Sequence, residues 1–235
     1  MPELSLKILS TLAVKGVIDE ITPALERAAG CHLDVAYDPT AVMLGKIRGG
    51  AKGDAAILTE QGIEQLTAEG RLIPGSRVDL AHSLIGLAVR TGAPKPDIST
   101  VETLKDTLRS TPSLVYSRGG ASGIFFAGLL GRLGLAEIVD AKATIIPGGF
   151  TAQHVARGEA EFAIQQISEL MVVPGVEIVG PLPEGAQESL LFCAAVFADT
   201  AKSQQVQAVL RLLAEPATAT VFTRKGLLPV APRAA

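Results

Sequence analysis

Short apolar segments alternate with amphipathic segments of helical period along most of the chain. The strand-like segments are LSLKILS (4–10), HLDVAYD (32–38), DAAIL (54–58), HSLIGLAVR (82–90), SLVYS (113–117), EFAIQQ (161–166) and SLLFCAAVFA (189–198). Helical patterns cover 13–29, 40–50, 60–70, 99–108, 125–139, 151–158 and 202–226. This alternation is typical of an α/β protein with mainly parallel sheets.

The apolar strands divide the chain into two blocks. The segments 82–90 and 189–198 bracket a second set of strand and helix units, and helices follow at the C-terminal end. We therefore expect lobe I to comprise 1–82 plus 195–235 and lobe II to comprise 83–194. Open α/β sheets bind ligands outside the carboxyl ends of their strands, so a cleft between the lobes is the expected place for a ligand.

Local signals predict three finer features. Thr22-Pro23 lies inside the first helical pattern and predicts a kink or restart there. Ser99 with Glu102 three residues later fits an N-cap and capping box. The segment 169–187, rich in glycine and proline, is expected to be a loop.

Charge and composition exclude several classes. The net charge is −3 and no lysine and arginine cluster is present, which argues against a nucleic-acid partner. The longest apolar runs are about half of the ~20 residues that a membrane span requires. Cys31 and Cys193 lack the spacing of a metal site, and we expect two buried thiols, without metal or cofactor. The N-terminus has no signal-peptide pattern, which indicates a cytoplasmic protein, or a periplasmic one if a signal has been removed.

The stretch SRGGASGIFFAGLLGRLG (117–134) places glycine-rich backbone directly before an apolar helix. This is either a simple turn or a seat for an anion, because the first N–H groups of a helix lack intrahelical partners and carry the positive end of its dipole. The lysine and spacing of a P-loop are missing. Arg118 can clamp a carboxylate or lie in solvent. The candidate ligand contacts here are Ser117, Arg118, Ser122 and Gly123.

Five segments together resemble the periplasmic molybdate-binding protein family of ABC-transporter solute receptors. They are LSTLAVKGVIDEITPALERAAG, YDPTAVMLGKIRGGAKGDAAIL, SLIGLAVRTGAPKPDISTVETLK, GGASGIFFAGLLGRLG and VARGEAEFAIQQISEL. The resemblance implies a type II periplasmic-binding-protein-like fold with two α/β lobes. It also implies that helix N-termini and hydroxyl groups hold an oxyanion between the lobes, without metal.

The resemblance also assigns individual residues. Ser10 matches the first hydroxyl of the family's site, with Thr11 beside it, and Thr40 matches the second. Ser122 takes the place of a small residue that donates its backbone N–H, and Phe150 or Thr151 begins the next helix, where another N–H is used. Gln166 stands where a tyrosine is common, and this departure widens the expected ligands from molybdate to organic acids such as polycarboxylates.

Two functions remain open from the sequence. The first is a solute-binding protein for a small anion, with an ABC permease as partner if the chain is exported. The second, implied by relatives that isomerise aconitate, is a cytosolic isomerase or tautomerase acting on a small unsaturated carboxylic acid. Glu169 and His154 are the candidate proton carriers for that reaction.

Overall fold

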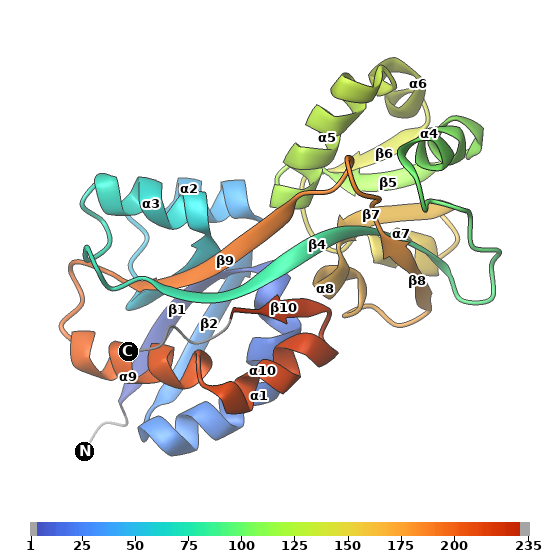
Figure 1. Ribbon diagram of the computed structural model, residues 1–235. Helices are drawn as coiled ribbons and strands as arrows, with labels where there is room; N and C mark the ends of the chain where they lie inside the picture. Colours follow the sequence, from blue (N-terminus) through green and yellow to red (C-terminus); the bar gives the residue numbers. More distant parts are fainter. Residues whose placement is uncertain (1–3, 231–235) are drawn as a thin grey trace. The chain divides into compact units, whose positions relative to one another are not determined.

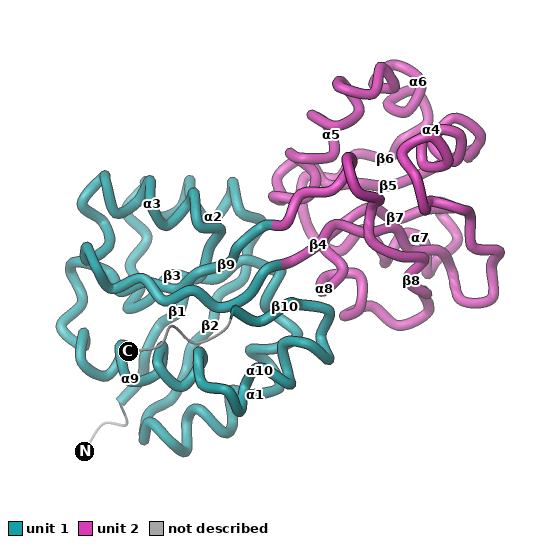
Figure 2. Tube along the Cα trace, in the orientation of Figure 1, with its two compact units in different colours: residues 1–82, 190–235 teal, residues 83–189 magenta. Residues whose placement is uncertain are grey.

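The computed structural model describes residues 4–230 and divides into two compact units (Figure 2). Within the described residues, the first unit comprises 4–82 and 190–230, and the second comprises 83–189. The chain passes between the units within β4 (Val78–Arg90) and again at the start of β9 (Ser189–Val196).

The first unit is built on a mixed sheet. Its strands include β1 (Ser5–Thr11), β2 (His32–Asp38) and β3 (Ala55–Thr59), in the order β2-β1-β3-β9-β4, with β10 (Leu227–Pro229) also paired to β4. The strand β1 pairs in parallel with both β2 and β3, whereas β9 pairs antiparallel to β3. The carboxyl ends of β1, β2 and β3 therefore lie at the same edge.

Helices cover both faces of this sheet (Figure 1). The helices α2 (Thr40–Arg48) and α3 (Glu60–Ala68) lie on one face, and α1 (Lys15–Ala29), α9 (Ser203–Leu213) and α10 (Pro216–Arg224) lie on the other. A short 3-10 helix, η1 (Leu12–Val14), joins β1 to α1. Successive residues of β1 pack on opposite faces of the sheet. Ile8 packs in the hydrophobic core beneath α1 and α9, and Leu9 packs in the core beneath α2 and α3.

The second unit has its own strand order, β4-β7-β5-β6. Its strands are β5 (Leu114–Ser117), β6 (Ala143–Ile146) and β7 (Phe162–Gln166), with β8 (Val176–Pro181) also paired to β4. The strand β5 is parallel to β6 and β7, and β7 is antiparallel to β4. The helices are α4 (Val101–Ser110), α5 (Ala121–Leu133), α6 (Ala136–Asp140), α7 (Ala152–Ala156) and α8 (Ile167–Leu170).

The expected mixed α/β fold with parallel strands and flanking helices is confirmed, but four details differ. The helix α1 runs without a break through Pro23, because a proline in the interior is tolerated where packing holds the helix. The cap of α4 is Thr100, not Ser99, and its partner in the capping box is Thr103. The segment 169–187 is not only a loop, because α8 ends and β8 lies within it. Strand β4 belongs to the sheets of both units, so the strand order is continuous instead of forming two separate sheets.

No helix within residues 4–230 is both long and apolar enough to cross a membrane.

A buried carboxylate links β1, β3 and the segment before α9 at the end of the first unit's sheet where β1 and β3 begin. Asp54, directly before β3, accepts hydrogen bonds from the backbone N–H of Lys7 at 2.8 Å and from Thr200 Oγ1 at 2.6 Å. Lys202 Nζ donates to Oδ2 of the same carboxylate at 3.1 Å. Burial alone raises the pKa of Asp54, but these donors and the lysine charge outweigh it and hold the pKa below its ordinary value. The ionised carboxylate therefore joins β1, β3 and the approach to α9.

We expect Asp54→Asn to lower the free energy of unfolding at pH 7 by about 1.5–3 kcal/mol, the worth of hydrogen bonds to a charged group. Because the folded pKa is depressed, this stabilisation is present above the unfolded pKa of about 3.9 and is lost as pH falls below it. Urea unfolding at neutral and acidic pH measures the difference. Asp34→Asn, at an exposed position on β2, is the matched control, and equal losses in both variants would contradict the role of Asp54.

Candidate anion-binding site

The carboxyl ends of β5 and β7 meet at one edge of the second unit's sheet. Val115 pairs with Ala163, and continuation of this parallel register brings Ser117 level with Gln165, one residue before the end of β7. This is the edge at which parallel α/β sheets bind ligands. The chemistry available there depends on the loops and helices that follow the two strands.

The start of α5 is held against the end of β5 by two glycines. A Cβ on Gly120 would lie 2.7 Å from Ser117 Oγ and 3.9 Å from Ser122 Oγ. A Cβ on Gly123 would overlap the carbonyl oxygen of Ser117. Only glycine permits this approach, so the glycine-rich turn places the positive end of a 13-residue helix and two serine hydroxyls in one small region.

Five residues of the second unit carry buried polar side-chain atoms that make no hydrogen bond within residues 4–230. They are Ser83, Ser117, Ser122, Gln166 and Ser168. Their exposed fractions are 3 % or less, and both amide atoms of Gln166 are in this set. Buried polar groups without partners cost free energy, and native proteins seldom keep several together unless a ligand or water completes them. This set points to a polar ligand.

Gln165 and Gln166 have different environments although they are neighbours. Gln165 Oε1 accepts hydrogen bonds from the backbone N–H of Thr151 at 2.8 Å and from Thr151 Oγ1 at 2.9 Å, and its Nε2 donates to the carbonyl of Gly149. Gln165 therefore holds the loop before α7 in place. Gln166, on the opposite face of β7, has its amide available.

The sequence predicted Thr151 as a possible ligand contact, but its donors are already engaged within the protein. Its backbone N–H and hydroxyl are both directed to Gln165, because the amide fills the space at the start of α7. Phe150 lies in the same loop, and its carbonyl accepts the N–H of Gln153. Of the two alternatives, Phe150 is the one whose N–H remains for a ligand.

Arg118 is exposed, and its side chain makes no hydrogen bond or ion pair with residues 4–230. Its backbone N–H donates to the carbonyl of Ile146 at 2.7 Å, which ties the residue to the end of β6. The guanidinium is thus held near the turn by its main chain while its donors stay available for a carboxylate.

Glu169 is almost completely buried in α8. Burial raises its pKa to about 8, although contacts with the backbone of Gln166 and the side chain of Gln165 oppose the shift. The raised pKa favours the neutral carboxylic acid, which does not repel an anion and can donate a proton, whereas the ionised form can accept one.

His154 is the weaker of the two predicted proton carriers. It lies in the last turn of α7, and its Nδ1 contacts Glu159 at 2.7 Å. Arg157 donates to the same carboxylate. These contacts engage His154 in an ion-paired group with an exposed glutamate, and not with the unpaired hydroxyls.

The first unit carries the other predicted hydroxyls at the carboxyl ends of its strands. Ser10 and Thr11 end β1, and Thr40 begins α2 directly after β2. All three are buried, and the Thr11 hydroxyl makes no hydrogen bond within residues 4–230, whereas Ser10 Oγ donates to the Thr11 carbonyl at 3.0 Å. Neither Ser10 nor Thr11 caps the following helix with its side chain.

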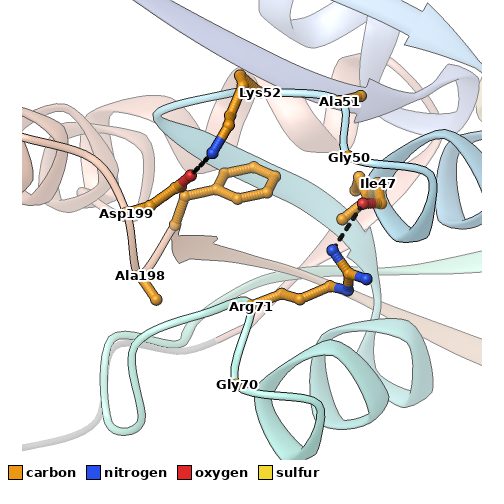
Figure 3. A pocket seen from close by; sticks show the side chains of 9 residues that line it. Ile47, Gly50, Ala51, Lys52, Gly70, Arg71, Ala198 and Asp199 are labelled. Atoms are coloured by element: carbon orange, nitrogen blue, oxygen red, sulfur yellow. Dashed lines mark hydrogen bonds and ion pairs between the residues drawn. The ribbon is translucent and has the colours of Figure 1, made fainter.

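Two cavities in the first unit lie away from these hydroxyls, beside the loop before β3. One, of about 200 Å³, is lined by residues that include Lys52, Arg71 and Asp199 (Figure 3). The other, of about 440 Å³, shares Lys52 and Asp199 with it. Lys52 pairs with Asp199, and Arg71 donates to the carbonyl of Ile47 at 3.0 Å.

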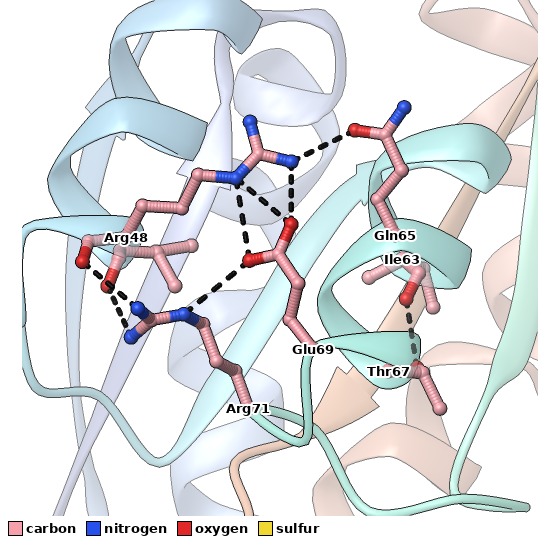
Figure 4. Close-up of polar contacts among 7 residues, drawn as sticks. Arg48, Ile63, Gln65, Thr67, Glu69 and Arg71 are labelled. Atoms are coloured by element: carbon pink, nitrogen blue, oxygen red, sulfur yellow. Dashed lines mark hydrogen bonds and ion pairs between the residues drawn. The ribbon is translucent and has the colours of Figure 1, made fainter.

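The charged groups next to the smaller cavity also have hydrogen-bond partners within the protein. Arg48 donates to Glu69 and Gln65, and Arg71 contacts the same glutamate (Figure 4). Because these charges already have partners inside the protein, we assign them to stability and not to ligand binding. Among residues 4–230, no group of three or more histidine, cysteine, aspartate or glutamate side chains is arranged to hold a metal ion.

Sequence reasoning missed Ser83 and Ser168. Neither lies in a glycine-rich motif, and each reads as an ordinary polar position beside an apolar strand. The signal that identifies them is their burial without a partner, which only the packed structure reveals.

A family model described as bacterial extracellular solute-binding protein matches residues 6–228. The chain belongs to this family. Among curated proteins, an aconitate isomerase from a Pseudomonas species is 37% identical over 235 residues, covering 97% of this chain and 89% of the relative.

Solved structures of solute-binding proteins share the fold. The periplasmic molybdate-binding protein of Azotobacter vinelandii superposes with a TM-score of 0.80 at 17% identity, covering 97% of this chain and 100% of its own. The sulfate-binding protein of Mycobacterium tuberculosis gives 0.79 at 16% identity, covering 97% and 88%. The predicted periplasmic-binding-protein fold is thereby confirmed.

Gly123→Ala is expected to lower the free energy of unfolding by about 3 kcal/mol or more, because the new methyl group overlaps the main chain of Ser117. Urea unfolding measures the loss. Gly131→Ala in the same helix is the control: its Cβ meets no atom within 4 Å, and we expect a gain of about 0.5–1 kcal/mol from helix propensity. Equal behaviour of the two variants would contradict the close approach at Gly123.

Proposed function

We propose that this protein binds a small organic acid that carries two or more carboxylates. The observation that carries the proposal is the group of buried, unpartnered side chains of Ser117, at the end of β5, Ser122, in the first turn of α5, and Gln166, at the end of β7. Hydroxyl and N–H donors hold carboxylate oxygens without a buried countercharge. Gly123 serves by letting the helix start approach Ser117.

Arg118 favours a carboxylate over a compact inorganic oxyanion. A tetrahedral oxyanion can be satisfied by hydroxyls and backbone N–H groups alone, whereas a longer polycarboxylate usually recruits an arginine for one end. The guanidinium next to this turn is unengaged within residues 4–230. The relative named aconitate isomerase also supports a polycarboxylate ligand.

The proposal assigns ligand contacts in the first unit to Ser10, Thr11 and Thr40, which occupy the corresponding strand and helix ends there. For transport, it adds an ABC permease as partner and a location outside the cytosol, in keeping with the family of solute-binding proteins.

Calorimetry with succinate, tricarballylate, trans-aconitate, sulfate and molybdate tests the ligand class. We expect the carboxylates to bind more tightly than molybdate. Arg118→Ala should weaken the preferred carboxylate by about 1.5–3 kcal/mol, because a charge-assisted hydrogen bond is lost. Arg109→Ala, which removes an exposed arginine paired with Asp106 on α4, should leave binding unchanged. Tight molybdate binding that survives Arg118→Ala would reject the organic-acid assignment.

A second candidate function is isomerisation of an unsaturated polycarboxylate, and the buried carboxyl of Glu169 favours it. In such a reaction a base takes a proton from the carbon next to the double bond, the double bond moves by one position, and the proton is returned to the former alkene carbon. Atoms and electrons balance without a cofactor. Glu169, with a pKa near 8, is suited to take and return this proton. The N-terminus of α5 is suited to stabilise the negative charge that develops on the substrate.

Glu169→Gln is expected to abolish conversion of cis- into trans-aconitate while binding of tricarballylate, which has no double bond, persists. In the wild type the rate should rise with pH and level off above about 8, because only the ionised carboxylate accepts a proton. Chromatography of the two isomers measures the rate. Undiminished turnover by Glu169→Gln would exclude Glu169 as the base, and no turnover by the wild type would leave binding as the function.

Stability gives an independent check on the same group. A folded pKa raised above the unfolded value of about 4.3 means that the folded state holds the proton more tightly, so wild-type stability falls as pH rises from there to about 8. Thermal melts of Glu169→Gln should lack this decline.

A further inference from the structure

Ser83 and Ser168 are buried serines whose hydroxyls have no role in the fold. Their exposed fractions are 0 % and 3 %, and neither hydroxyl makes a hydrogen bond with any residue from 4 to 230. Most buried hydroxyls at least bond to a nearby carbonyl, as Ser10 Oγ does to Thr11 at 3.0 Å. Two unsatisfied hydroxyls therefore need a specific reason.

The sheet register places Ser83 near Gln166, and Ser168 follows Gln166 closely in the chain. Ile85 of β4 pairs with Gln166 of β7 in antiparallel register, and Ser83 lies two residues before Ile85 on the same strand. Side chains two residues apart on a strand share a face, so Ser83 and Gln166 are on the same face as diagonal neighbours. Ser168 follows Gln166 by two residues, in the first turn of α8, so chain connectivity keeps it near the end of β7.

This face of the sheet is the one that α5 covers. Ile85 packs in one core with Phe126 and Leu129 of α5, so the Gln166 amide and Ser83 are on the side of Ser122. The strand order β4-β7-β5 separates Ser83 from Ser117 by two strand spacings, and the registers offset them by about three residues along the strands, so their backbones lie roughly 14 Å apart. One carboxylate cannot engage groups that far apart, so a second carboxylate of the ligand is needed to reach Ser83.

We propose that Ser83 and Ser168, together with Gln166, form a subsite for a second carboxylate of the ligand, separate from the hydroxyl pair at the start of α5. The inference rests on the proposed function and names what selects the length of the acid. The first carboxylate is held by Ser117 and Ser122 with the helix dipole, and the second by two hydroxyls and one amide. These three side chains are uncharged, so they would distinguish acids of different length by geometry and by the number of hydrogen-bond donors.

The chemistry of these groups suits this role. Each serine hydroxyl rotates to donate to a carboxylate oxygen, and Gln166 Nε2 supplies two further N–H groups. Gln166 Oε1 accepts from a donor on the ligand or from a serine hydroxyl that does not face a carboxylate. Without ligand these atoms stay unsatisfied, which destabilises the free protein and lets the ligand recover that free energy on binding.

The test measures how tightly acids with one, two and three carboxylates bind to the wild type and to the Ser83→Ala and Ser168→Ala variants. Propionate, succinate and tricarballylate are titrated by calorimetry into the full chain, and the melting temperature is recorded without ligand. Each variant should bind succinate and tricarballylate about tenfold more weakly, the worth of one hydrogen bond to a charged group, while its affinity for propionate stays within twofold of the wild type. Each should also melt at the same or a higher temperature than the wild type.

Ser110→Ala is the matched control. Ser110 is an exposed serine in α4 whose hydroxyl donates to the carbonyl of Asp106 in its own helix, so this variant should change neither affinity nor selectivity. If succinate and tricarballylate bind both buried-serine variants as they bind the wild type, the subsite is wrong. A uniform loss for all three acids, with a lower melting temperature, would show that the serines are structural. If the wild type binds none of the acids, the proposed function itself fails and the subsite with it.

Discussion

The close approach of α5 to the end of β5 is the contact on which the candidate site depends. Gly123 allows the helix to lie against the carbonyl of Ser117, and Gly120 leaves room for the hydroxyls of Ser117 and Ser122. A side chain at either position would move the helix start away from the strand. The dipole and the first backbone N–H groups would then no longer coincide with the buried hydroxyls.

The second unit keeps its candidate site polar but almost uncharged. Serine hydroxyls and a glutamine amide form the buried set, burial favours the neutral form of the Glu169 carboxyl by raising its pKa to about 8, and the arginine stays exposed. An anion that enters such a site meets donors without a buried opposing charge. The desolvation of a buried ion pair, which is a large cost, is thereby avoided.

The first unit shows the opposite use of polar groups around its cavities. Lys52 with Asp199, and Arg48 with Glu69, form pairs whose charges are satisfied within the protein. Asp54 collects donors from three segments. The polar groups that line these cavities are therefore satisfied within the protein, in contrast to the buried polar atoms without partners in the second unit.

Local patterns in the sequence determined the strands, most helices and the glycine-rich strand-to-helix turn within Ser117–Gly134, because apolar periodicity and glycine placement act over a few residues. The motif also made Ser122 a candidate contact, and the family resemblance did the same for Gln166. Sequence could not distinguish Gln165, which holds Thr151, from Gln166, which is available, since that choice depends on which face of β7 meets α7. It also could not find Ser83 and Ser168. Their significance arises because antiparallel pairing of β4 with β7 brings residues more than eighty positions apart into one buried set, and burial without partners is a property of the packed chain alone.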